Sequence, residues 1–435
     1  TTGNSTRSNR SVLQRSLLSK MACDRLPSSP EPASAPMPAV AAPLEDESLL
    51  PEILLRLSSL PSSLPRASLV CNRWRHLVTD RRFVRRFRAH HRRNPPPLLG
   101  FFDEVTRSPT SEIPAPGAPN SLSFNPILDP PDRLPVGRFS FHFRDGDSHS
   151  NIGCRDGLVL MVDAAHHDVE ILVWDPVTGD EHRFTVPWVL DDRDGTEILN
   201  GAVLRTAGIE DDPRFRFQVV VVGIDRKNKR LFACAYTSET SKWGDPVWAS
   251  VDSASSPATI SMRVSSTLVG NSLYWTLVGK TGGILEFDLD RQHLSVIPVQ
   301  LNTSSDGFRS FQAMPAEGGG LGILELLDFN IQLWKRKTDS DGVVSWLMTK
   351  TVELDQLLSL DKEKVGPMMM GYCEDNNVVF LWTLLGIFMV DLKSLKVRKP
   401  PIKSFYGLVH PFTSVYIPDM GIGGGRDGAN ILHNA

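Results

Sequence analysis

Cysteine is scarce in this sequence: the 435 residues contain five, an odd number with no close pair. This scarcity argues against a disulfide framework and favours a reducing compartment. No Cys-x-x-Cys pair, and no quartet of histidines and cysteines, has the spacing of zinc ligands. We therefore expect the protein to hold neither a metal ion nor a cofactor.

Long apolar runs are also absent. No run reaches the roughly 18 residues that a membrane span needs, and no charged segment leads into an apolar stretch as in a signal peptide. The expectation is a soluble intracellular protein, in the cytoplasm, the nucleus or both, with no membrane partner.

The first 73 residues contain no Phe, Tyr or Trp, and residues 1–43 are rich in Ser and Pro, with six prolines from Pro27 to Pro43. Such a segment cannot bury enough apolar area to offset the roughly 1–2 kcal/mol per residue that ordering the backbone costs. We predict a disordered tail over 1–43 and a flexible, Gly-rich tail over 421–435.

Apolar residues at helical spacing appear in residues 44–93. The first group is Leu49, Leu50, Ile53, Leu54 and Leu57; the second is Ala67, Val70, Cys71, Trp74, Leu77 and Val78; the third is Phe83, Val84 and Phe87. This pattern predicts a small all-α unit of three short helices. A core this small, without a disulfide or a metal, indicates that a partner completes it.

The charge is unevenly distributed. Residues 73–93 hold nine arginines and one acid, Asp80, whereas the whole chain has a net charge of −3. The stretch is therefore +8 and the remainder −11. Solvated helix faces, attraction to an acidic protein and nucleic-acid binding are all compatible with the arginines. Phe83 and Phe87 fall on the apolar face, away from the arginines, which argues against base stacking and nucleic acid.

Beyond residue 94, short β-rich runs alternate with turn signals. A degenerate repeat of about 50 residues is clearest at 156–187, 271–298 and 376–397, and weaker copies lie near 217–248 and 321–352. This spacing predicts a large all-β, propeller-like domain of six or seven blades over 94–420; an irregular β-sandwich is the alternative. Residues 103–135, with eight prolines, are predicted to form a long loop, and 355–364 a short helix.

The helical region resembles the F-box. Residues 70–83 match the tail of its pattern, V-C-x-x-W-x-x-L-(I/V)-x-D-x-x-F, although Glu45 follows Leu44 where the family usually has Pro. The order of Ser/Pro tail, F-box and β-repeat region is similar to the large plant F-box family, particularly grass members with an F-box-associated β-propeller-like domain.

The resemblance implies a substrate receptor of a Skp–cullin–F-box ubiquitin ligase, with no catalytic residues of its own. It would dock a Skp-family adaptor, and through it the cullin and the RING subunit, and recruit a protein substrate for ubiquitination through the β domain. The residues expected to bind the adaptor are Leu49, Leu50, Ile53, Leu54, Leu57, Leu64, Pro65 and Leu69. Those expected to form the F-box core are Val70, Trp74, Leu77, Val78 and Phe83.

Two other functions are considered. One is a non-catalytic scaffold that does not assemble into a ligase, and the other is a propeller enzyme. The sequence has only five tyrosines, no Gly-x-Ser-x-Gly motif, and glycine runs at 318–320 and 421–425 that lack the Lys-Ser/Thr of a phosphate loop; a histidine pair, His166–His167, is expected to be solvated. Candidate substrate-recognition segments, chosen only because they are long or irregular, are 103–135, 188–200 and 303–320.

Overall fold

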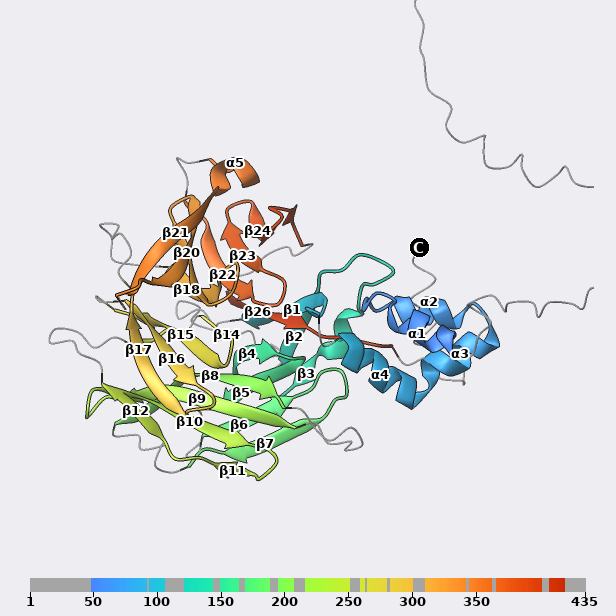
Figure 1. The fold of residues 1–435 in the computed structure, drawn as a ribbon, viewed down its shortest axis with the longest axis horizontal. Coiled ribbons are helices and arrows are strands. Elements are labelled where there is room, and N and C mark those ends of the chain that lie inside the picture. Colours follow the sequence, from blue (N-terminus) through green and yellow to red (C-terminus); the bar gives the residue numbers. More distant parts are fainter. Residues whose placement is uncertain are drawn as a thin grey trace, which may run out of the picture. The chain divides into compact units, whose positions relative to one another are not determined.

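A computed structural model describes residues 48–91, 94–105, 121–143, 149–163, 169–187, 195–206, 216–250, 259–262, 264–279, 282–299, 310–341, 344–361, 365–400 and 407–418 (Figure 1). The two predicted tails, 1–43 and 421–435, lie outside these residues, as do His166 and His167.

The F-box-like region folds into four helices rather than three: α1 (Leu49–Leu55), α2 (Ser63–Ser68), α3 (Asn72–Thr79) and α4 (Arg81–His91). The second predicted helix is divided because the chain leaves helical conformation after α2, and Cys71 is extended, with φ −163° and ψ 169°. The apolar spacing runs on across this break, so the pattern alone predicts one helix. None of the helices in the described ranges has the length and hydropathy to cross a membrane.

The remainder of the described chain is almost entirely strands in antiparallel sheets. The first sheet contains β1 (Leu98–Val105), β2 (Ser121–Pro126), β3 (Phe141–His142) and β26 (Gly407–Thr413). The second contains β4 (His149–Arg155), β5 (Leu158–Asp163), β6 (Glu170–Trp174) and β7 (Glu181–Thr185). The third contains β8 (Thr196–Arg205), β9 (Phe217–Asp225), β10 (Arg230–Thr237), β11 (Lys242–Trp243) and β12 (Val247–Ser250).

Three further sheets follow. The fourth contains β13 (Thr259–Ile260), β14 (Thr267–Val269), β15 (Ser272–Val278), β16 (Gly283–Asp288) and β17 (His293–Pro298). The fifth contains β18 (Ser310–Pro315), β19 (Leu321–Leu327), β20 (Asn330–Thr338) and β21 (Val344–Glu353). The sixth contains β22 (Met368–Cys373), β23 (Val378–Thr383), β24 (Gly386–Asp391) and β25 (Val397–Arg398). One short 3-10 helix, η1 (Val136–Phe139), precedes β3, and α5 (Leu354–Leu358) follows β21.

The described strands therefore form a six-bladed propeller, within the predicted range of six or seven blades (Figure 1). Each of the five repeat copies found in the sequence corresponds to one blade. The first blade was not predicted. Its strand β2 lies inside the segment 103–135 that was expected to be a loop, so that expectation is wrong for residues 121–126.

The ring closes through the C-terminal strand. β26 pairs antiparallel with β1, bringing His410 opposite Phe102, and becomes the innermost strand of the first blade. Phe102 lies between Phe124 of the same blade, Phe412 of β26 and Trp174 of the second blade, at ring-centroid distances of 5.3, 5.4 and 5.7 Å. Aromatic packing therefore joins the two ends of the ring.

The hydrophobic core lies between neighbouring blades rather than at the centre. One buried cluster, for example, joins Val220 and Leu231 of the third blade to Trp275 and Leu285 of the fourth, and similar clusters fill the other interfaces. A single blade cannot bury both faces of its sheet, so stacking around a ring is what makes these strands stable.

The two ends of the propeller differ. The connection from the innermost to the second strand of each blade lies at one end. There, Asn376 donates a hydrogen bond to the carbonyl of Pro96 at 3.2 Å, just before the chain enters β1. We call this end the linker face. The turns from the second to the third strand, such as Leu384–Leu385, lie at the opposite face.

Candidate functional site

Helix α1 has one buried and one exposed apolar side. Leu50 and Leu54 are 1% and 0% exposed, whereas Leu49 and Ile53 are 46% and 36% exposed. Residues four apart lie on the same side of a helix, so Leu49 and Ile53 form one apolar stripe that the described residues leave uncovered. Leu57 is half-buried.

The end of α2 exposes a second apolar pair. Leu69 and Val70 are 57% and 61% exposed, although Leu64, one turn earlier, is buried and Pro65 is half-buried. Val70 was expected in the core, and the structure places it at the surface. The reason is the break between α2 and α3, which turns residues 69–71 away from the helical register that the sequence pattern suggests.

The core of the helical region is built on α3 and α4. Val78 and Phe83 are buried, while Trp74 and Leu77 are half-buried. Phe87 and His91 continue the buried side of α4, with ring centroids 4.3 Å apart. Burial, together with the neighbouring His90, lowers the pKa of His91. Residues 83, 87 and 91 are spaced four apart, so the sequence could have predicted that His91 lies on the buried side of α4.

Asp80, the acid within the arginine-rich stretch, starts α4. Its Oδ1 accepts hydrogen bonds from the backbone N–H groups of Arg82 and Phe83, at 2.8 and 2.9 Å, which is how an aspartate caps a helix N-terminus. Arg86 of the same helix forms an ion pair of 2.6 Å with Glu52 of α1. The acid and one arginine of this stretch therefore have structural roles.

Three of the remaining arginines of α4 lie on its solvent side, whereas Arg88 is half-buried. Arg81, Arg82 and Arg85 are exposed, and the pair Arg81 and Arg85 is four residues apart, a spacing at which like charges repel by a few tenths of a kcal/mol. The structure thus agrees with the interpretation of solvated helix faces and does not by itself require an anionic partner.

Hydrogen bonds join the innermost strands of the propeller through the segment between β13 and β14. Its described residues, 261–262 and 264–266, form the axial segment, and Thr267 begins β14. Asn200 of β8 donates to the carbonyls of Ser261 and Val264 at 2.9 and 3.0 Å. Thr267 donates to the carbonyl of Ala313 of β18 at 2.8 Å.

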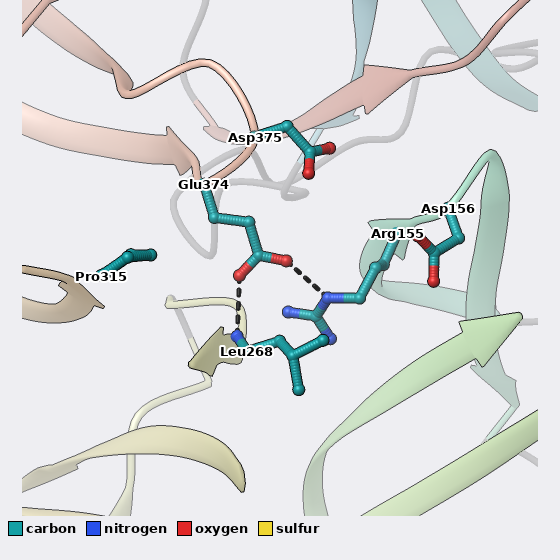
Figure 2. Close-up of a pocket in the computed structure, with 6 residues that line it drawn as sticks. All are labelled: Arg155, Asp156, Leu268, Pro315, Glu374 and Asp375. Carbon is teal, nitrogen blue, oxygen red and sulfur yellow. Dashed lines mark hydrogen bonds and ion pairs between the residues drawn. The ribbon is translucent and has the colours of Figure 1, made fainter. Parts of the chain in front are cut away.

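A buried ion pair lies where the axial segment meets the linker face (Figure 2). Arg155 Nε lies 2.6 Å from Glu374 Oε1, so the pair links the second blade to the sixth. The other guanidinium nitrogens donate to the hydroxyl and the carbonyl of Ser266, at 3.1 and 2.8 Å. Glu374 Oε2 accepts from the backbone N–H of Leu268 at 2.7 Å. Burial acts to lower the pKa of Arg155, but the Glu374 carboxylate outweighs it and raises that pKa.

A hollow of about 190 Å³ adjoins this pair, with Asp156, Asp375 and Pro315 in its wall (Figure 2). Burial raises the pKa of Asp375, and the hydrogen bond from Thr413, at 2.7 Å, only partly opposes that rise. The polar groups of the hollow bind one another across the blades. The arrangement holds the ring together. In the same axial segment, the Ser265 hydroxyl lies 3.4 Å from Nδ1 of His410, but neither residue lines the hollow.

The buried thiols are also in unreactive surroundings. Burial raises the pKa of Cys234 to about 12 and also raises that of Cys373, and a thiol is nucleophilic only as the thiolate. Within the ranges that the structure describes, no three His, Cys, Asp or Glu side chains gather as metal ligands.

The segments that were candidates for substrate recognition are only partly described. Residues 106–120, 188–194 and 301–309 lie outside the described ranges, and what is described of 310–320 is strand β18 and a tight glycine turn. The exposed apolar residues of the fifth and sixth blades could not be identified from the sequence, because exposure depends on how the blades cover one another.

Comparison with known proteins gives two family matches. Residues 151–419 match the family described as "F-box protein AT5G49610-like, beta-propeller", and residues 43–86 match the F-box domain. No curated protein matches the chain.

Among solved structures, the chain is similar to the Dos1 propeller, with 12% identity over 66% of each chain and a TM-score of 0.34. It is also similar to a protein from Lactobacillus plantarum, with 10% identity, 72% of this chain and 98% of that one covered, and a TM-score of 0.37. At these TM-scores neither similarity supports an argument about function.

Proposed function

We propose that this chain, which belongs to the family of F-box proteins with an AT5G49610-like β-propeller, is the substrate receptor of a Skp–cullin–F-box ubiquitin ligase. The observation that carries the proposal is an F-box with uncovered apolar side chains, connected by only six residues, 92–97, to a six-bladed propeller. Residues 44–93 would be the adaptor-binding domain and 94–420 the substrate-binding domain.

The adaptor-binding surface in this proposal consists of the exposed apolar residues Leu49, Ile53, Leu69 and Val70. Of the residues expected from the sequence to touch the adaptor, Leu50, Leu54 and Leu64 are instead buried within the chain, and their role would be to support this surface. Burying a fully exposed valine, leucine or isoleucine contributes on the order of 1.5–3 kcal/mol before ordering costs. These four side chains are 36–61% exposed, so covering each would contribute roughly half as much, and together they favour a partner.

The receptor would make no bonds itself. Its contribution is to hold a protein substrate near the ubiquitin-loaded conjugating enzyme that the cullin and RING subunits bring, which raises the effective concentration of the reacting groups. The mutual hydrogen bonds of Arg155, Glu374 and Ser266 and the unreactive thiols support a binding role for the propeller. A protein of this kind would work in the cytoplasm, the nucleus or both.

Capture of a purified Skp adaptor by the full chain tests the proposal. Replacing two exposed residues, Ile53→Lys with Leu69→Lys, should abolish capture without unfolding the protein, because neither side chain is part of the core. Leu384→Lys, at a propeller leucine that is 55% exposed, is the matched control and should bind normally.

Two results would contradict the proposal. Capture that survives the double substitution would exclude this docking surface. An unmodified chain that captures no adaptor would favour the non-catalytic scaffold.

A further inference from the structure

Exposed apolar side chains are concentrated in two adjacent blades. Among the described residues of the propeller, eleven large apolar side chains are exposed, and eight of them lie in the fifth and sixth blades: Val344, Leu347, Met348, Val365, Met368, Leu384, Leu385 and Leu395. Three of the eight, Val344, Leu347 and Met348, lie on one strand, β21, and neighbouring exposed apolar residues mark interaction surfaces more often than scattered single residues do.

The fifth blade also has the longest outer strand. β21 has ten residues, whereas the outermost strands of the other five blades have at most six. β21 pairs with β20 on one side, and among the described strands none pairs with its other side (Figure 1). A long free edge presents backbone N–H and C=O groups that an extended segment can pair with.

One face of the sheet beside this edge is exposed because the outer strand of the next blade is short. Leu333 packs in the core shared with the sixth blade, so Lys335 and Lys337, two and four residues further along β20, point to that side. Leu347 of β21 pairs with Lys335 and points the same way. The outer strand of the sixth blade, β25, has only two residues, too few to cover these side chains.

The other side of the edge carries mainly apolar side chains, with Arg336 opposite Trp346. Met348 pairs with Trp334, which packs in the core shared with the fourth blade, so Met348 lies on the Trp334 side. Val344 lies four residues away on the same side. Met348 and Val344 are 49% and 44% exposed, so an added strand would meet lysines on one face of the sheet and apolar side chains on the other.

The lysine side is basic within an acidic chain. Residues 330–350 hold four basic and two acidic side chains, and residues 391–399 hold four and one, a net charge of +5. Lys350 Nζ donates to the carbonyl of Leu392 at 2.8 Å, which joins the two stretches. Outside them and residues 73–93, the chain has a net charge of −16. Lys335 is half-buried, and its Nζ donates to the carbonyl of Glu317 at 3.0 Å. Lys337 pairs with Asp339 at 3.0 Å, but its side chain is 61% exposed.

We propose that the free edge of β21 binds an extended segment of a substrate protein in which acidic and apolar residues alternate. The segment adds a fifth strand to the blade. Its acidic side chains face Lys335 and Lys337, and its apolar side chains contact Val344 and Met348. The identification of this segment with a ligase substrate depends on the proposed function, whereas the binding itself does not.

The test uses the purified full chain and a fluorescent ten-residue peptide in which valine and glutamate alternate, with affinity measured by anisotropy. Lys335→Glu with Lys337→Glu, and separately Met348→Asp, should weaken binding at least tenfold. The matched controls are Lys227→Glu with Lys229→Glu on the exposed turn of the third blade, and Met368→Asp, which is as exposed as Met348 at 49%. Both should bind normally.

Backbone pairing is tested with two further peptides that carry N-methyl groups at alternate positions, one in each register. One of them should lose binding at least tenfold. Any of four results would overturn the inference. The first two are no binding of the unmodified peptide and equal binding of that peptide by all variants. The other two are equal binding of both methylated peptides and tighter binding of a single-stranded oligonucleotide than of the peptide. Adaptor capture by the same variants is measured in parallel and should be unchanged. This control distinguishes a wrong ligase assignment from a wrong assignment of the peptide-binding edge.

Discussion

Replacing Arg155 should destabilise the propeller severely, because the guanidinium joins three blades. The Arg155 side chain is 8% exposed and that of its partner Glu374 17%. An Arg155→Met change keeps the apolar stem but removes the three hydrogen bonds to Glu374 and Ser266. It leaves a nearly buried carboxylate with a single donor, the N–H of Leu268.

Breaking a buried pair on one side costs about 3–5 kcal/mol. A large domain loses about 2 °C in Tm per kcal/mol, so the expected drop is roughly 6–10 °C, measured by near-UV circular dichroism and by urea unfolding with an unchanged m-value. Adding Glu374→Gln should recover at least half of the loss, since the amide oxygen still accepts from Leu268 and no charge is left buried.

The matched control is Arg226→Met. Arg226 also pairs with a glutamate, Glu197, but the two side chains are 60% and 46% exposed, and a surface pair of this kind is worth about 0–1 kcal/mol. If Arg155→Met costs no more than Arg226→Met, the buried pair does not hold the blades together and the reasoning is wrong.

Two further predictions concern single carboxylates. Burial raises the pKa of Asp375 above its ordinary 3.8, so the stability that its protonated form contributes is lost as the pH rises through the folded-state pKa. Asp375→Asn should therefore be more stable than the parent at pH 7, and its unfolding free energy should depend less on pH between 4 and 7. An unchanged pH dependence would contradict this. Asp80→Ala should cost about 0.5–2 kcal/mol by removing the N-terminal cap of α4 and weaken adaptor capture, whereas Asp80→Asn should restore most of both.

The repeat was visible in the sequence because an aspartate ends the same strand in several blades. Asp175, Asp288 and Asp391 each follow or end the third strand, and the carboxylate of each accepts backbone N–H groups two or three residues on. These hydrogen bonds stabilise the turn that follows the third strand. Because the turn recurs in the blades, the aspartate recurs at the same place in the sequence repeat.

What the sequence did not predict depends on contacts distant along the chain. β26 lies about 300 residues from β1, with which it pairs, so no local pattern identifies it as the closing strand. Val70 fits the helical spacing but lies beyond the end of α2, at the surface. β21 has a free edge because it is the outermost strand of its blade, and one face beside that edge is exposed because β25 of the next blade is short; only the assembled ring shows the second point.

The closing seam gives the last prediction. Gly371 of β22 lies against β26, and a Cβ at Gly371 would be 2.3 Å from the carbonyl oxygen of Val409. Backbone cannot give way as a flexible side chain does, so Gly371→Ala should force the sixth and first blades apart and cost at least about 1–3 kcal/mol. Gly137→Ala is the control, because no atom lies within 4 Å of its Cβ position. The measurement is urea unfolding of both variants; equal midpoints would show that the seam tolerates the extra carbon and that the ring does not depend on close contact between β22 and β26.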